Sequence, residues 1–146
     1  MPLEELYRDA LLEHNRRPRN LGVLPGATHR ARGLDALCGD DIEFHLKLGA
    51  GGVIEQAAFT GQACAVTTAA ASMLTDWLVG RRVEEFHAAR ETFSLMLSDP
   101  DGPDRPELGE FNHLKGVARF PARVRNAMLP WRTAAAALKG EPLAEN

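Results

Sequence analysis

The most regular hydrophobic pattern in the chain is an alternation of apolar and polar residues over positions 42–48. Apolar side chains stand at every even position of this segment, which is typical of a strand that buries one face. The Gly-Ala-Gly-Gly sequence after it predicts a flexible turn, and residues 53–60 predict the antiparallel return strand. A more weakly signalled strand is predicted over residues 31–37. These segments together predict a small meander with one solvated face.

Apolar residues recur at helical spacing in three segments of the N-terminal two-thirds of the chain. Residues 3–14 predict an amphipathic helix, which cannot continue through Pro18. Residues 64–79 predict a helix rich in alanine and serine, whose small side chains allow it to pack closely on the sheet. Gly80 ends this helix, and residues 83–97 predict a further one.

The segment over residues 98–110 contains three prolines and two glycines and is predicted to be a surface loop. A short helix is predicted over residues 111–116. Too little chain follows the loop for a second domain, so residues 1–146 are expected to form a single domain.

A last helix is predicted over residues 121–138, although Pro130 lies inside it. The proline ring would clash with the carbonyl group of Asn126, and its missing N–H cannot bond that carbonyl. We therefore expect a kink or break between Asn126 and Pro130, with a separate terminal helix over residues 131–138. The tail after Lys139 is expected to fray.

Composition and charge exclude some classes of protein function. With 45% hydrophobic residues, 25% charged residues and a net charge of −3, the sequence is that of an ordinary globular protein. It has no basic block that would indicate binding to nucleic acid, and no apolar stretch long enough to cross a membrane. Residues 1–16 lack the apolar core of a signal peptide, so we expect a cytoplasmic protein with reduced cysteines.

The first of the two cysteines stands one glycine before an aspartate, in Cys38-Gly39-Asp40. In an extended backbone the side chains of Cys38 and Asp40 point to the same side. This arrangement suits a thiophilic metal, because the thiolate is a soft ligand and the carboxylate adds an exchangeable oxygen. The alternative is a buried thiol beside an aspartate that forms a turn.

The second cysteine, Cys64, stands at the start of a predicted helix. Unpaired backbone N–H groups and the helix dipole stabilise negative charge there, which suits a metal ligand or a nucleophile. The alternative is a small apolar residue in an alanine-rich interface. Cys64 lies 26 positions after Cys38, so the two do not form a C-x-x-C redox or zinc-knuckle motif.

Several separate motifs, in order along the chain, resemble the U-type iron-sulfur cluster assembly proteins, the family of SufU, IscU and the NifU N-terminal domain. They are Leu6-Tyr7, His14, Pro18-Arg19-Asn20, Cys38-Gly39-Asp40, Gly61 to Cys64, Ala71-Ser72-Met73 and Phe120-Pro121-Ala122-Arg123-Val124. The chain is more similar to the SufU branch than to IscU, because FPARV replaces the LPPVK motif of IscU and a charged, proline-rich insertion occupies residues 98–107. The resemblance extends over nearly the whole chain.

The resemblance implies an α+β fold, with a three-stranded antiparallel sheet covered by helices and one metal site at the end of the protein. It implies that Cys38, Asp40 and Cys64 are ligands of zinc or of a transient iron-sulfur cluster. Arg123 matches the family's arginine near the site. The implied partners are a pyridoxal-phosphate cysteine desulfurase of the SufS-like kind, which would pass sulfur to Cys38, and other cluster assembly proteins.

One ligand of the family's site is missing, because Asn126 stands at the position of its third cysteine. An amide is a poor substitute for a thiolate on zinc or iron. Affinity for zinc is therefore expected to be lower, and stable cluster scaffolding by one chain is disfavoured.

We therefore expect an iron-sulfur cluster assembly protein of the SufU type, with sulfurtransferase or scaffold activity, that accepts persulfide sulfur at Cys38 and passes it on. The alternative is a non-catalytic adaptor or regulator of the desulfurase that has lost full metal or cluster binding. A third hypothesis is a thiol redox protein in which Cys38 and Cys64 form a reversible disulfide.

Overall fold

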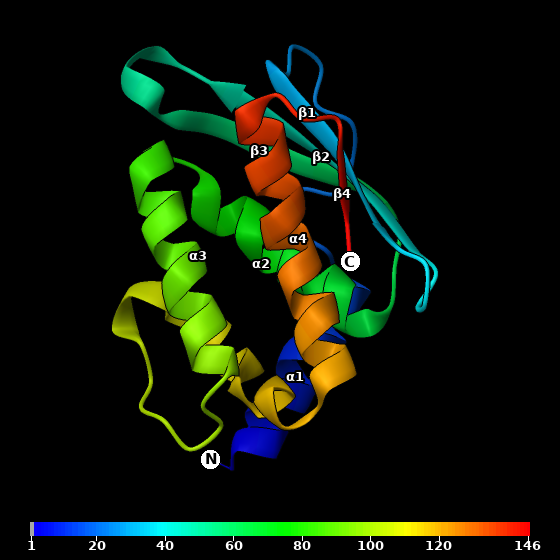
Figure 1. Cartoon of the computed structure of the whole chain (residues 1–146), viewed down its shortest axis with the longest axis vertical. Coiled ribbons are helices and arrows are strands. Elements are labelled where there is room, and N and C mark those ends of the chain that lie inside the picture. The colour runs from blue at the N-terminus through cyan, green and yellow to red at the C-terminus, as the bar shows by residue number, and fades with distance from the viewer. Residues whose placement is uncertain (1) are drawn as a thin grey trace.

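The computed structural model describes residues 2–146 as one sheet with helices packed against one of its faces (Figure 1). The helices and strands are α1 (Leu3–Arg16), β1 (His29–Asp35), β2 (Asp40–Leu48), η1 (Ala50–Gly52), β3 (Ile54–Gln62), α2 (Ala65–Leu78), α3 (Val83–Leu97), η2 (Pro106–Arg119), α4 (Pro121–Lys139) and β4 (Leu143–Glu145). The helices α1, α2 and α3 confirm the three N-terminal helix predictions. Within residues 2–146, no helix is long and apolar enough to cross a membrane.

The sheet has four strands in the order β3-β2-β1-β4. The predicted α+β class is confirmed, and β1, β2 and β3 pair in the antiparallel manner expected. The predicted three-stranded antiparallel sheet is nevertheless wrong, because β4 adds a fourth strand that runs parallel to β1. β4 has three residues, too few to show a two-residue hydrophobic period, so sequence pattern alone did not reveal it.

Helix α4 is continuous through Pro130, so the predicted break and separate terminal helix are wrong. A proline removes one N–H from the helix ladder and frees one carbonyl, here that of Asn126. The hydroxyl oxygen of Thr67 in α2 lies 3.3 Å from this carbonyl oxygen, but its one proton is shared with the closer carboxylate of Asp40 at 2.5 Å, so it replaces the missing donor only in part. Burial of α4 against the sheet and α2 offsets the remaining cost.

The main aromatic core lies between α3, α4 and η2. Trp131 of α4 is fully buried, and the ring centroids of Phe86, Phe93 and Phe111 lie 5.7, 5.1 and 4.9 Å from its own. Phe111 belongs to η2, so the C-terminal part of the predicted loop and the predicted short helix form one 3-10 segment interrupted at Gly109. This packing fixes α4, which carries one side of the candidate site.

A buried polar cluster holds α1 against α2 and η2. The His14 ring bonds the Ser72 hydroxyl at 2.6 Å through Nδ1 and Glu110 at 3.2 Å through Nε2. Arg19 donates to the same carboxylate at 2.6 Å. The hydrogen bond from His14, together with the nearby charges of His14 and Arg19, lowers the pKa of Glu110, although partial burial acts in the opposite direction.

We expect Glu110→Gln to lower the melting temperature by several degrees at pH 7. A carboxyl group whose pKa is lower in the folded state stabilises the fold above its unfolded pKa, and this contribution is lost as the pH falls through the folded pKa. The difference between Glu110→Gln and the unmodified chain should therefore shrink below about pH 4. Thermal unfolding followed by circular dichroism between pH 3 and pH 7 measures both effects.

The matched control is Asp76→Asn, which removes the other carboxylate that Arg19 contacts, at 3.2 Å and with 57% of its side chain exposed. An exposed ion pair contributes little, so this variant should melt within about 2 °C of the unmodified chain. Equal losses in both variants would contradict a specific role of Glu110.

Candidate functional site

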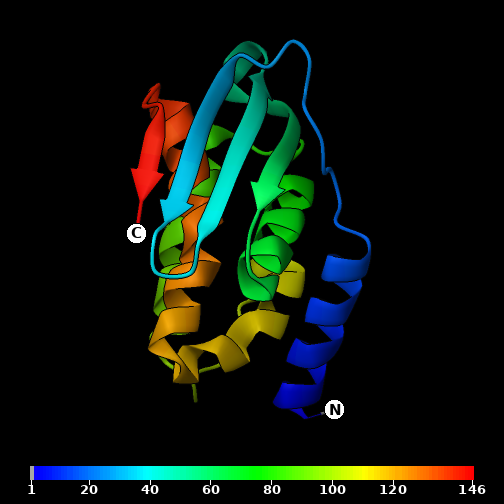
Figure 2. The ribbon, with the colours of Figure 1, turned by 90° about the vertical axis from the view of Figure 1, so that its right-hand side faces the viewer.

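The residues singled out at the sequence level come from four separate segments that meet at one end of the sheet. Cys38 lies in the turn between β1 and β2, and Asp40 begins β2. Cys64 immediately precedes α2, and Asn126 lies in the second turn of α4. Figure 2 shows the turn between β1 and β2 beside α4 at this end of the sheet. The tertiary structure therefore gathers residues that are far apart in the chain.

Asp40 is the centre of the buried half of the site. Its carboxylate is almost fully buried and accepts three hydrogen bonds. The donors are the backbone N–H of Cys64 at 2.7 Å, the Thr67 hydroxyl at 2.5 Å and the Asn126 side-chain amide at 3.1 Å. The Cys64 sulfur lies 3.7 Å from the same carboxylate. Both oxygens of Asp40 are therefore engaged by groups of the protein itself.

Cys38 occupies the open half of the site. It is an exposed free thiol, and Gly39 after it has a φ of 72°, which favours glycine and closes the turn. The Cys38 sulfur lies 3.7 Å from the side-chain oxygen of Asn126 and 3.9 Å from Nη2 of Arg125. The sulfur is therefore accessible to a partner and has a cation beside it.

The side chain of Asn126 lies between the two halves of the site. Its oxygen faces the Cys38 sulfur, and its nitrogen donates to Asp40. Among residues 2–146 no three His, Cys, Asp or Glu side chains are grouped closely enough to hold a metal ion. In this arrangement the donor set does not fit zinc, because the amide separates the predicted ligands and the carboxylate is already engaged by three donors of the protein. Metal binding by Cys38, Asp40 and Cys64 therefore stays a prediction.

Arg123 points to a different neighbourhood from Arg125. Its guanidinium lies over the ring of Phe120, 4.5 Å from the ring centroid. Burial raises the pKa of Tyr7, and the nearby charge of Arg123 opposes this effect. Arg123 thus belongs to the contact between the start of α4 and α1, and its place near the metal site stays a prediction.

Three residues of the site were missed by sequence reasoning. Thr67 donates to Asp40, Arg125 approaches Cys38, and Asp35 caps the turn by accepting the backbone N–H groups of Leu37 and Cys38 at 3.0 and 3.3 Å. The available signals were local: Thr67 follows Cys64 by one helical turn, and Arg125 precedes Asn126 directly. Neither spacing shows which side chain Thr67 or Arg125 contacts in the folded protein.

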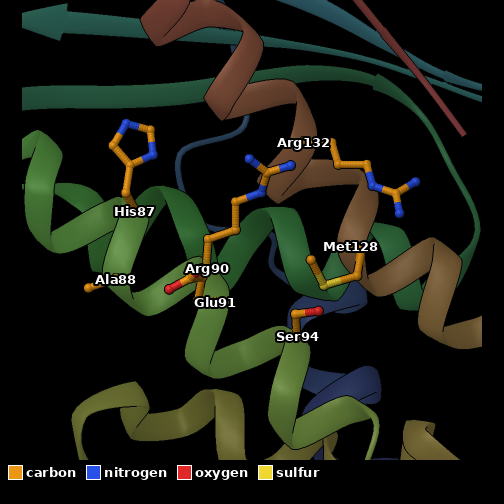
Figure 3. Close-up of a pocket in the computed structure, with 7 residues that line it drawn as sticks. All are labelled: His87, Ala88, Arg90, Glu91, Ser94, Met128 and Arg132. Carbon is orange, nitrogen blue, oxygen red and sulfur yellow. The ribbon is translucent and has the colours of Figure 1, made fainter.

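A cavity of about 570 Å³ lies between α3 and α4 and contains none of the predicted site residues (Figure 3). It is open and lined by polar side chains such as His87, Arg90 and Arg132. Cys38, by contrast, is exposed and lies outside this cavity.

Comparison with known proteins bears on the family of the chain. The profile of the family described as "NifU-like N terminal domain" matches residues 6–127. The zinc-dependent sulfurtransferase SufU of Bacillus subtilis is 35% identical over 130 residues, which cover 89% of this chain and 87% of the relative. The iron-sulfur cluster assembly scaffold protein IscU of Streptococcus pyogenes is 36% identical over 137 residues, which cover 94% and 85%.

Solved structures show the same fold. The putative scaffold protein for the SUF system from Fervidobacterium islandicum superposes with a TM-score of 0.83 at 22% identity, covering 92% of this chain and 98% of the other. A hypothetical protein at 35% identity also has a TM-score of 0.83, covering 93% and 98%. From the matching profile and these relatives, the chain belongs to the NifU-like N-terminal domain family of iron-sulfur cluster assembly proteins, with SufU among its similar members.

Proposed function

We propose that this protein serves iron-sulfur cluster assembly as a sulfur acceptor of the SufU type, which takes persulfide sulfur from a SufS-like, pyridoxal-phosphate cysteine desulfurase in the cytoplasm at Cys38. The observation that carries the proposal is the Cys38 sulfur itself, which is exposed, belongs to no disulfide and lies in a turn 3.9 Å from the guanidinium of Arg125. The Bacillus subtilis relative, named a sulfurtransferase, supports the same reaction class.

The transfer is an exchange between a thiol and a persulfide, with no net oxidation or reduction. The Cys38 thiolate attacks the outer sulfur of the desulfurase persulfide, forming a new S–S bond while the old one breaks. The desulfurase cysteine leaves as a thiolate and takes up the proton that Cys38 gave up. The guanidinium of Arg125 can compensate the negative charge first on the attacking sulfur and then on the new persulfide.

The buried half of the site supports the turn and keeps a second thiol close. Asp40 holds the N–H of Cys64 and the amide of Asn126, so the start of α2 and the second turn of α4 are joined beside Cys38. A metal bound by Cys38, Asp40 and Cys64 would need the Asn126 amide to move away. No step of the proposed transfer therefore passes through zinc or a cluster.

Intact-protein mass spectrometry tests the proposal directly. After incubation with the desulfurase and cysteine, the mass should increase by one sulfur atom in the unmodified chain and in Cys64→Ser. The increase should be absent in Cys38→Ser. An unmodified Cys38 in the unmodified chain would overturn the proposal.

The same experiment separates the second candidate function, an adaptor or regulator of the desulfurase. The hydrogen bond from the Asn126 amide to Asp40 favours this candidate, because the amide stands in place of the family's third thiolate and occupies the carboxylate. If the protein is an adaptor, the Cys38→Ser variant should change the turnover of the desulfurase as much as the unmodified chain does. Neither protein should gain mass.

A further inference from the structure

Asp35, the last residue of β1, connects three parts of the chain around Cys38. Its side chain is 1% exposed. One oxygen accepts the N–H groups of Leu37 and Cys38, and the other accepts Nε of Arg125 and the side-chain amide of Asn146, each at 3.0 Å. A buried carboxylate with four donors is held rigidly, because each bond removed would leave a polar group unpaired. The turn of Cys38, α4 and the C-terminal segment thus share one anchor.

The bond between Arg125 and Asp35 orients the guanidinium toward Cys38. A guanidinium is a rigid plane, so fixing Nε limits where the two terminal nitrogens can lie. Nη2 lies 3.9 Å from the Cys38 sulfur, and the arginine side chain is only 31% exposed. The position of the cation at the sulfur therefore depends on the anchor.

Asn146 completes the anchor from the C-terminal side. Its side-chain nitrogen donates to Asp35 at 3.0 Å and to the backbone carbonyl of Arg125 at 2.9 Å, while its oxygen accepts Nη1 of Arg132 at 2.5 Å. Its backbone N–H donates to Leu34 at 3.0 Å. Figure 2 shows that β4 runs beside β1 toward the end of the sheet that carries the turn of Cys38.

From this chain of contacts we propose that Asp35 and Asn146 are positioning residues that hold the guanidinium of Arg125 against the Cys38 sulfur, so that the C-terminal segment sets the reactivity of that sulfur toward anionic reactants. The assignment rests on the proposed role of Cys38 as sulfur acceptor. A persulfide donor is itself anionic, so a fixed cation at the acceptor favours its approach. Without the anchor, Arg125 turns toward solvent and the cation is screened.

The test is the rate at which Cys38 in the full chain is alkylated by iodoacetate, which is anionic, relative to iodoacetamide, which is neutral. Peptide mass spectrometry separates Cys38 from Cys64. Arg125→Gln should lower the ratio about five-fold, because opposite charges about 4 Å apart attract one another even in water. Arg125→Lys should lower it less.

Asn146→Ala is the decisive variant, because Asn146 carries no charge and can change the ratio only through its charged neighbours, Arg125, Asp35 and Arg132. In Asn146→Ala we expect the alkylation ratio at Cys38 to fall by about half as much as in Arg125→Gln, or more. When Asn146→Ala is added to Arg125→Gln, the ratio should not fall further. Leu143→Ala is the matched control, since it is a neutral change of an exposed residue in the same C-terminal segment.

An unchanged ratio in Asn146→Ala overturns the proposal. A fall of equal size in the presence and absence of Arg125 also overturns it, because the effect would then be a general loosening of the sheet edge. Failure of the proposed sulfur transfer is distinguishable, since the desulfurase assay would then show no mass gain while the alkylation ratio still depends on Asn146.

Discussion

Asn126→Cys should convert a chain that holds little zinc after purification into one that holds close to one zinc per chain. The substitution adds a third thiolate to Cys38 and Cys64 and removes the amide that lies between the predicted ligands. It also removes one of the donors on Oδ2 of Asp40. Four-coordinate sites with three cysteines and one further ligand are typical of tightly bound zinc. Elemental analysis of the purified proteins, followed by competition with a chelator, measures the change.

Asn126→Ala separates two causes of this gain. It removes the amide without adding a thiolate, so a chain that gains zinc as Asn126→Ala would show that the amide alone excludes the metal. We expect Asn126→Ala to hold far less zinc than Asn126→Cys. Equal zinc in the unmodified chain and in Asn126→Cys would contradict the conclusion that the present donor arrangement does not suit zinc.

Gly61→Ala should destabilise the fold by about 3 kcal/mol or more, which corresponds to a fall in melting temperature of roughly 10 °C. Gly61 has a φ of 120°, a backbone conformation that residues with a Cβ rarely adopt. A Cβ at this position would also lie 2.1 Å from the backbone oxygen of Asp41 on the neighbouring strand. The end of β3 would have to move away from β2, and the N–H of Cys64 would move away from Asp40.

Gly39→Ala is the matched control for this prediction, because Gly39 also has a positive φ of 72° but a Cβ there meets nothing within 4 Å. Only backbone strain of about 1 kcal/mol is expected, with a correspondingly small fall in melting temperature. Chemical denaturation of both variants compares them on one scale. Equal losses would show that backbone strain, and not the close approach of β2, explains the need for glycine at position 61.

The residues of the candidate site could be named from the sequence, whereas the hydrogen bonds among them could not. The types and order of Cys38, Asp40 and Cys64 indicate sulfur or metal chemistry, and the matching family profile confirms the family. The sequence showed that a thiolate is missing at Asn126. It did not show that the amide donates to Asp40, because that bond joins positions 86 residues apart and depends on how α4 packs.

The sequence by itself determined the elements that repeat a pattern over many residues, namely β2, β3 and the helices α1 to α3. Only the tertiary structure decided that α4 continues through Pro130 and that a three-residue strand closes the sheet as β4. Local periodicity reports which face of a segment is buried, but these features depend on partners supplied by distant segments. The Thr67 hydroxyl beside the freed carbonyl of Asn126 and the contacts of Asn146 with Asp35 and Arg125 are such partners.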